Sequence, residues 1–317
     1  MQNCGAFTLA RAMSAGMIRI LMYHNFSAPG ETDTDDVSVT ALHDQFEYLL
    51  RHFKVVPLAH VLQQLSSGRP LDRHTVALTI DDGRRNCYEF LFPILKKFQV
   101  PATFFVVSSF IRREDWLWTD QVLWLSEQPS RPGELAQDRI NGFFAALNRL
   151  QPSVRQAHVA AMAAQMDVSI PKEPPSKYAP CSWSELREMA DTGLVEIGSH
   201  TVTHPILATV TDEESWYELT VSRTQLEEGL GRKINSFCFP NGKSGDYRPS
   251  QVQQVRDAGY TSAVVASAGM VRRGDDPHEL PRIGISGRVD TLSFSKYLSG
   301  AEYYQRRLRE LFRPRGG

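Results

Sequence analysis

Apolar, strand-like segments alternate with helical patterns along most of this chain, and this alternation is the strongest constraint on its fold. The strand candidates are short and rich in β-branched residues, and they lie at residues 18–23, 76–80, 102–107, 194–197, 237–239, 261–265 and 283–285. Strands that alternate with helices are typical of parallel βαβ units, in which reactive groups gather at the carboxyl ends of the strands. The sequence therefore predicts an α/β fold with its chemistry at strand ends.

The alternation is interrupted at about residues 112–180. Two helical stretches, near residues 134–150 and 154–166, lie there among a cluster of prolines, which we interpret as a helical insertion. The alternation then resumes. Capping boxes begin two of the later helices, formed by Ser182 with Glu185 and by Thr211 with Glu214.

This pattern sets the expected domain limits. We predict one α/β domain over residues 18–290, interrupted by the insertion. Residues 1–17 form no convincing pattern and are expected to be a disordered tail. Residues 291–317 are expected to form a C-terminal helix with a basic tail, whose apolar side docks on the domain.

Composition narrows the function classes. Lys and Arg number 35 against 36 for Asp and Glu, so the net charge of −1 gives no support for a nucleic-acid partner. No apolar run approaches the ~18 residues of a membrane helix, and no secretory signal is evident. We therefore expect a cytoplasmic protein, with an envelope-associated location as the alternative. The scattered cysteines indicate neither a cysteine-zinc cluster nor a disulfide framework.

Two adjacent carboxylates, Asp81 and Asp82, follow the strand at residues 76–80. Successive side chains of a strand point to opposite faces, so at a strand end one carboxylate binds an ion while the other stays free to move a proton. Gly83 then lets the backbone turn tightly. Asp-Asp-Gly is also ordinary turn chemistry, so this signal by itself leaves both interpretations open.

A second signal, the pair His200 and His204, follows the strand at 194–197. Pro205 disfavours a helical conformation at His204, so a loop is expected, and a loop lets both imidazoles approach one ion. With Asp82 they form a three-ligand set with room for water, as in catalytic zinc centres. Because a metal lowers the pKa of bound water toward ~7 and polarises carbonyl oxygens, hydrolysis is the expected reaction class.

These motifs carry a family resemblance. Residues 79–82, Thr-Ile-Asp-Asp, are similar to a T-F-D-D motif, and residues 200–204, His-Thr-Val-Thr-His, match H-[ST]-x-x-H. Residues 20–24 are similar to the first strand of many members. The chain thus resembles polysaccharide deacetylases with a NodB homology domain, carbohydrate esterase family 4. The resemblance implies a distorted (β/α) barrel with a divalent metal ion, Zn²⁺ being the first choice. It also implies removal of N-acetyl groups from an oligosaccharide, a polysaccharide or a glycan precursor.

The resemblance also implies roles for individual residues. It makes Asp81 the general base that activates water, while Asp82, His200 and His204 hold the metal. The family's L-x-x-H-D motif, the usual source of the general acid, has no counterpart here. His24, at the end of the first strand, is our candidate for the acid, and its alternative is a capping or packing histidine.

The family's R-x-P-Y motif is altered in this chain. It corresponds to Cys-Phe-Pro-Asn at residues 238–241, so the arginine that orients the base is replaced by cysteine. We expect Arg282 to reach the carboxylates from another strand and lower the pKa of an aspartate; the alternative is a surface salt bridge. The segment Pro240, Asn241 and Gly242 is expected to shape the substrate pocket, with the backbone N–H groups that follow the proline available to the oxyanion.

Two rival functions stay open at this point. The altered motifs leave room for a catalytically impaired sugar-binding protein on the same fold. A metal site indicates the type of reaction but says less about which leaving group is released. An amidohydrolase that acts on a non-sugar amide is therefore the other alternative. Three tryptophans near the start of the insertion are interpreted as core residues, with sugar stacking as the alternative: Trp116, Trp118 and Trp124.

Overall fold

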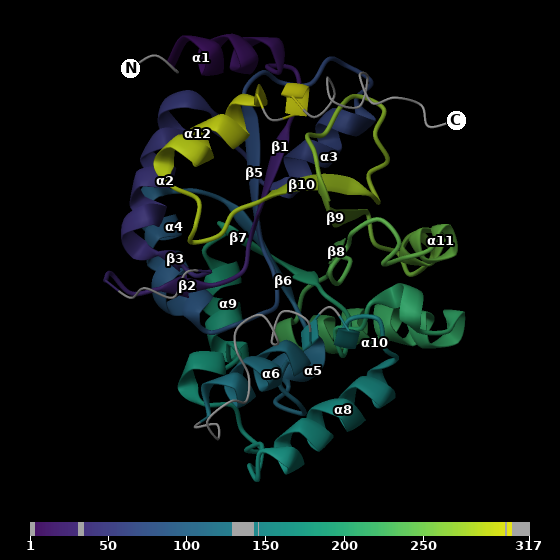
Figure 1. Ribbon diagram of the computed structural model, residues 1–317. Helices are drawn as coiled ribbons and strands as arrows, with labels where there is room; N and C mark the ends of the chain where they lie inside the picture. The colour runs from purple at the N-terminus through teal and green to yellow at the C-terminus, as the bar shows by residue number, and fades with distance from the viewer. Residues whose placement is uncertain (1–3, 31–34, 129–142, 145, 302, 306–317) are drawn as a thin grey trace, which may run out of the picture.

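Parallel strands close into a barrel at the centre of the molecule (Figure 1). The computed structural model describes residues 4–30, 35–128, 143–144, 146–301 and 303–305. Within these residues the barrel is formed by β1 (Arg19–Tyr23), β5 (Thr75–Ile80), β6 (Ala102–Val106), β7 (Val195–Ser199), β8 (Ser236–Cys238), β9 (Ser262–Ala268) and β10 (Leu280–Gly284). Strand β1 pairs in parallel with both β5 and β10, which closes the ring. The predicted α/β barrel is confirmed.

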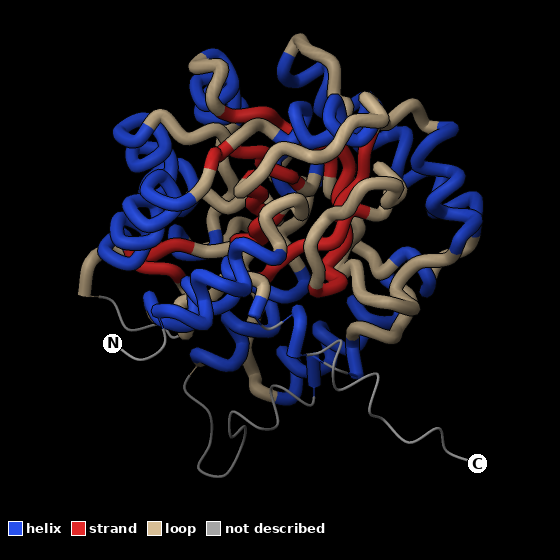
Figure 2. The backbone as a smooth tube through the Cα atoms, turned by 90° about the horizontal axis from the view of Figure 1, so that it is seen from above, coloured by secondary structure: helices blue, strands red, loops and turns tan. Residues whose placement is uncertain are grey.

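Helices surround these strands, which lie inside a ring of helices when the barrel is seen from above (Figure 2). The α-helices are α1 (Cys4–Met13), α2 (Val39–His52), α3 (Leu58–Ser66), α4 (Phe92–Phe98), α5 (Ser108–Ile111), α6 (Trp118–Glu127), α8 (Pro152–Gln165), α9 (Trp183–Asp191), α10 (Asp212–Leu230), α11 (Pro249–Asp257) and α12 (Thr291–Ser299). A π-helical turn, η1 (Cys87–Leu91), directly precedes α4. Two short 3₁₀ turns are η2 (Ser176–Tyr178) and η3 (Leu207–Thr209). Short strands lie beside them: β2 (Phe26–Ser27) pairs with β3 (Val37–Ser38), and β4 (Lys54–Val55) pairs with β5. No helix of the described ranges is both long and apolar enough to cross a membrane.

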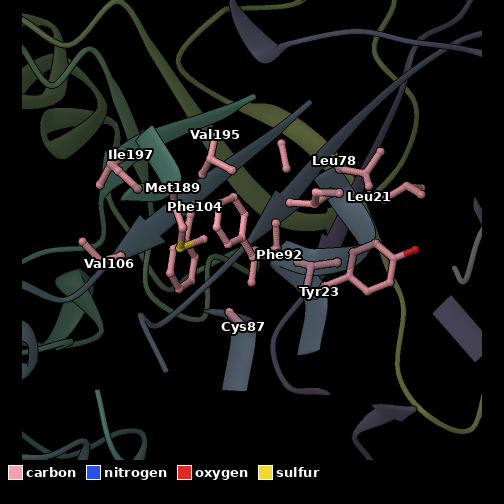
Figure 3. Packing of buried hydrophobic residues seen from close by; sticks show 14 of the residues in the cluster. Leu21, Tyr23, Leu78, Cys87, Phe92, Phe104, Val106, Met189, Val195 and Ile197 are labelled. Atoms are coloured by element: carbon pink, nitrogen blue, oxygen red, sulfur yellow. The ribbon is translucent and has the colours of Figure 1, made fainter. Parts of the chain in front are cut away.

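Strand β5 shows how the barrel separates two apolar layers. All six of its residues are buried. Val76, Leu78 and Ile80 belong to the large cluster between strands and helices, which also contains Phe104 of β6 and Phe92 of α4 (Figure 3). Ala77 belongs to the smaller cluster inside the barrel. Because side chains alternate along a strand, the next inward position after Thr79 is occupied by Asp81.

The two predicted capping boxes are confirmed. Ser182 caps α9 and exchanges hydrogen bonds with Glu185, and Thr211 caps α10 in the same way with Glu214. Each box satisfies backbone N–H groups that the first turn of a helix leaves without partners. The caps thus fix the first residues of α9 and α10, the helices before and after β7.

The prediction that residues 1–17 are disordered is wrong for the described part of that segment. Helix α1 occupies Cys4–Met13 and packs against α12. Behind it, Ser14 Oγ donates a 2.9 Å hydrogen bond to the carbonyl of Ser299, and the buried Arg19 donates to the carbonyl of Leu298 at 2.9 Å. The helix is stabilised by a partner almost the whole chain away, which no local pattern reveals.

The predicted insertion and C-terminal segment can be compared with the structure only where their residues are described. The insertion contributes α6 and α8, of which α8 corresponds to the second helical stretch. Most of the first stretch, residues 134–150, lies outside the described residues, as does the basic tail after residue 305. Helix α12 lies where the C-terminal helix was predicted to begin. The domain limits of 18–290 stay a prediction.

Candidate active site

Asp81 forms a two-point ion pair with Arg282 inside the mouth of the barrel. Its Oδ1 and Oδ2 each lie 2.7 Å from a guanidinium nitrogen of Arg282, and both side chains are buried. Arg282 also donates to Thr79 Oγ1 at 3.0 Å and to the carbonyl of Val265 at 3.2 Å. Burial would raise the pKa of Asp81, but the charge and hydrogen bonds of Arg282 outweigh it and lower that pKa. The structure thus brings together Asp81, the base candidate, and Arg282, the arginine expected to reach it.

Cys238 contacts both partners from β8. Its Sγ lies 3.5 Å from Asp81 Oδ2 and 3.2 Å from Arg282 Nη2. Burial raises the pKa of this thiol far above its ordinary value, so it stays protonated and donates to the carboxylate. Position 238, where the resembled motif has an arginine, therefore still contacts Asp81, and Arg282 of β10 provides a guanidinium to the same carboxylate.

The proposed metal ligands face one another beside this pair. The Nε2 atoms of His200 and His204 are 3.2 Å apart, and each lies 3.7 Å from Asp82 Oδ1. Ligands on a tetrahedral Zn²⁺ at ~2.0–2.1 Å would be about 3.3 Å apart, so these three atoms fit one such ion. His200 Nδ1 donates to the carbonyl of Cys238 at 2.8 Å, which leaves its Nε2 lone pair facing the other two donors.

Electrostatics keep this donor set ready for a cation. Burial lowers the pKa of His200, and burial together with His200 lowers the pKa of His204 to about 3, so both imidazoles are neutral. Burial opposes ionisation of Asp82, but the positive charge of Arg84 outweighs it and lowers the pKa of Asp82. Neutral imidazoles and an ionised carboxylate are the forms that bind a metal.

The loop from His200 to His204 is held in an unusual backbone conformation. Thr201 and His204 have positive φ angles of 71° and 56°. The loop is secured by the buried Glu218 of α10, whose carboxylate accepts the backbone N–H groups of Val202 at 2.7 Å and Thr203 at 2.9 Å. Loop geometry was expected from Pro205, but the anchor on α10 was not, because no sequence pattern links it to the histidines.

His24 lies at the rim, where its Nε2 is 3.8 Å from Asp81 Oδ2 and its side chain is 45% exposed. It lines, with the base and the metal-ligand candidates, a cavity of about 560 Å³. His24 follows the end of β1, so its side chain lies at the rim between the cavity and solvent. Nothing in the geometry makes it a core histidine.

The segment 240–242 is only partly as predicted. Asn241 lines the cavity, whereas Pro240 and Gly242 are not among its lining residues. The N–H of Gly242 donates to the carbonyl of Pro240 at 2.6 Å, so this N–H is not free for an oxyanion. Gly242 has a φ of 56°, and a Cβ there would lie 2.9 Å from Ala266 N. Its role is to let the turn pass close to β9.

Sequence reasoning missed Arg84 and Asp120. Arg84 Nη1 lies 2.6 Å from Asp82 Oδ2, and Asp120 binds the same guanidinium through both oxygens. Arg84 directly follows the Asp-Asp-Gly motif, which was a signal that this arginine is near the site. Its partner Asp120 comes from the insertion and gave no signal.

The insertion forms another wall of the cavity, with Trp118, Phe144 and Asn148 among the lining residues. Trp118 and Trp116 are both buried, as the core interpretation predicts. Trp116 packs with Trp124 and Tyr178 at ring distances of 6.1 Å. Arg155 lies 4.6 Å above the ring of Trp118, so this face is not available for stacking on a sugar.

Comparison with known proteins gives one family for most of the chain. The family model described as polysaccharide deacetylase matches residues 68–263. A poly-β-1,6-N-acetyl-D-glucosamine N-deacetylase of Escherichia coli K12 is 37% identical over 76 residues, which are 24% of this chain and 11% of that protein. A protein of the same name from Staphylococcus aureus is 27% identical over 118 residues, 37% of this chain and 40% of the relative. The match therefore spans less than half the length of either relative.

Solved structures share the fold. The Streptococcus pyogenes deacetylase PplD in complex with acetate aligns with a TM-score of 0.62 and 19% identity, over 89% of this chain and 98% of the other. IcaB from Ammonifex degensii aligns with a TM-score of 0.60 and 19% identity, over 89% and 97%. At this identity the likeness shows a common barrel and not a common substrate.

Proposed function

This chain belongs to the polysaccharide deacetylase family, and from that premise we propose that it hydrolyses N-acetyl groups of a polysaccharide or glycan precursor. One observation carries the proposal: the buried pair of Asp81 with Arg282 opens into the same cavity as Asp82, His200 and His204. A base and a metal-ligand set on one cavity are what amide hydrolysis by activated water requires.

The family is metal-dependent, and we assign the metal to Asp82, His200 and His204 in this chain. Two imidazole nitrogens and one carboxylate oxygen at mutual distances of 3.2–3.7 Å suit Zn²⁺. When bound, such an ion polarises the acetyl carbonyl and lowers the pKa of water. The chain itself keeps the two imidazoles neutral and the carboxylate of Asp82 ionised. It also orients the ring of His200 through a hydrogen bond to the carbonyl of Cys238.

Asp81 is assigned the role of general base. Arg282 keeps its carboxylate ionised at neutral pH despite burial, and the two-point contact fixes the plane of the carboxylate. Its Oδ2 is the oxygen nearer His24, so it is the oxygen we expect to accept the proton of the attacking water. The Cys238 thiol donates to the same oxygen and limits its basicity.

His24 is assigned the role of general acid. Its imidazole stands at the exposed rim with Nε2 close to the base, which places it between solvent and the cavity. From there it donates a proton to the departing amine of the sugar. His24, which follows β1, would thus act in place of the L-x-x-H-D motif, which has no counterpart in this chain.

The substrate we propose is an N-acetylglucosamine oligomer or polymer. Both curated relatives carry the name of a poly-β-1,6-N-acetyl-D-glucosamine deacetylase. The cavity is open and walled on one side by the insertion, which leaves room for sugars beyond the one that loses its acetyl group. The location predicted from sequence stays a prediction.

Acetate release from β-1,6-linked and β-1,4-linked N-acetylglucosamine oligomers, with the metal content of the same preparation, tests the proposal. We expect one metal per chain and acetate release that a chelator abolishes and Zn²⁺ restores. Asp81→Asn is the matched control, because it should bind metal without releasing acetate. Metal binding without acetate from any oligomer would refute the assigned activity and favour a sugar-binding protein or a non-sugar amidohydrolase. Absence of metal would refute the assigned ligands.

A further inference from the structure

Arg84 lies between two carboxylates in the wall of the cavity. Its Nε and Nη2 donate to the two oxygens of Asp120 at 3.0 and 2.6 Å, and its Nη1 donates to Asp82 Oδ2 at 2.6 Å. Nη1 also donates to Asn25 Oδ1 at 2.9 Å. Arg84 is 6% exposed and Asp120 fully buried, so solvent screens these contacts little.

The contact divides the two oxygens of Asp82 between two tasks. Oδ2 is bound by Arg84, while Oδ1 is the oxygen 3.7 Å from both His200 Nε2 and His204 Nε2. A rotation that brought both oxygens toward the imidazoles would break a short, buried, charge-assisted hydrogen bond. Asp82 also has a φ of 81°, so its backbone is held in a conformation that few non-glycine residues adopt.

We propose that Arg84 is a positioning residue that restricts Asp82 to binding the metal through one oxygen. The inference rests on the proposed function, because it concerns the same metal ligand. Carboxylates bind metals through one oxygen or two, and a second oxygen would occupy a position that water or the acetyl carbonyl needs. Arg84 thereby keeps the coordination sphere open.

Asp120 makes this arrangement compatible with a nearby cation. Alone, a guanidinium that bound Asp82 would bring an uncompensated positive charge next to the metal. Asp120 binds the far side of the guanidinium with both oxygens, so the group of Asp82, Arg84 and Asp120 retains a net negative charge. Asp120 lies in the first turn of α6, where backbone N–H groups stabilise a carboxylate.

The same contacts attach the insertion to the metal ligand. Arg84 also forms a β-bridge with Pro180, where the insertion returns to the barrel, and its carbonyl accepts from the thiol of Cys181. Both ends of the insertion therefore contact the residue that holds Asp82 Oδ2. The insertion acts on the metal centre through Arg84, besides lining the cavity.

The test compares Zn²⁺-loaded proteins by zinc K-edge X-ray absorption. In Arg84→Gln/Asp120→Asn, the glutamine amide ends near the place of the Arg84 Nε, so it can pair with the asparagine but cannot reach Asp82. We expect the first shell of zinc in this variant to gain one oxygen neighbour. We expect kcat for acetate release to fall roughly 10–100-fold, the usual size of an outer-shell effect, with little change in KM.

Matched variants separate the proposal from a general structural effect. Asp120→Asn alone leaves Arg84 on Asp82, so its first shell should equal that of the wild type. Arg85→Met removes the neighbouring arginine, which pairs with Glu185 at 2.9 Å away from Asp82, and should change neither shell nor kcat. If the amide pair prevents folding, Arg84→Met/Asp120→Leu is the apolar replacement of the buried pair, with the same expected gain of one oxygen.

The outcomes distinguish this inference from the proposed function. A folded double variant whose zinc has the wild-type first shell would overturn the role of Arg84 and leave the deacetylase intact. A wild type that binds zinc through these ligands but releases no acetate would refute the activity, while the comparison of first shells would still decide the role of Arg84. A wild type that binds no zinc would overturn both.

Discussion

Replacing Arg282 by methionine removes the guanidinium that donates two hydrogen bonds to Asp81. The two 2.7 Å contacts disappear, while the carboxylate stays in a buried position at the mouth of the barrel. Loss of one partner from a buried ion pair costs about 3–5 kcal/mol, because the remaining charge is left without compensation. We expect Arg282→Met to lower the free energy of unfolding by this amount at neutral pH.

The loss should depend on pH, and its sign follows from the pKa of Asp81. In the wild type this pKa is lowered, so the ionised carboxylate contributes stability above the unfolded-state pKa of about 3.9, and the contribution is lost as pH falls below it. In the variant only burial and weaker neighbours remain, so the pKa of Asp81 should rise above its unfolded value. The carboxylate then destabilises the variant at neutral pH and becomes harmless once it is protonated.

Urea unfolding at neutral pH and at about pH 4, near the ordinary carboxyl pKa, measures this difference. The gap between wild type and Arg282→Met should shrink at the lower pH. Arg232→Met is the matched control, because the pair of Arg232 with Asp191 is solvent-exposed and should contribute at most about 1 kcal/mol. A gap of equal size at both pH values would show that the hydrogen bonds of Arg282 to Thr79 and Val265, and not its charge, stabilise the fold.

Four further predictions concern the site. Asp81→Asn should abolish acetate release and leave metal content near wild type; loss of the metal would show that the roles of the two aspartates are exchanged. His24→Ala should remove the alkaline limb of the pH–rate profile, and an unchanged profile would eliminate it as the acid. His204→Ala should reduce bound metal well below one per chain, measured by elemental analysis of the dialysed protein. Gly242→Ala should lower the thermal midpoint, because its Cβ would lie 2.9 Å from Ala266 N and Phe239 O in a backbone that disfavours side chains; an unchanged midpoint would contradict the close packing of this turn.

The alternation of strands and helices predicted an α/β fold with its chemistry at the carboxyl ends of parallel strands, and the resemblance to polysaccharide deacetylases implied the closed barrel. Parallel strands bring their carboxyl ends to one side, so Asp81 after β5 and His200 after β7 had to lie near one another once the sheet closed. The ligand set was also predictable. Two histidines in one short loop and an aspartate at a strand end are local features, and their chemistry does not depend on distant packing.

The partners of these residues were decided by tertiary structure. Arg282 could be proposed for the carboxylate pair, but its choice of Asp81 depends on which residues of β10 face inward, next to an irregular register with β9. Asp120 pairs with Arg84 only because the insertion folds back onto the cavity. Likewise α1 is a helix because α12 offers it a surface.

From the amino-acid sequence by itself, strand and helix periodicity indicated an α/β fold, and short-range spacing indicated the base candidate and the three metal-ligand candidates. The barrel was implied by the family that these motifs resemble. Only the tertiary structure decided which arginine binds Asp81, which oxygen of Asp82 faces the histidines, and that the Gly242 N–H is already bonded. The physical reason is the distance along the chain over which each interaction acts. Alternation along a strand and spacing within a loop act over a few residues, whereas a buried ion pair is chosen by every element that packs around it.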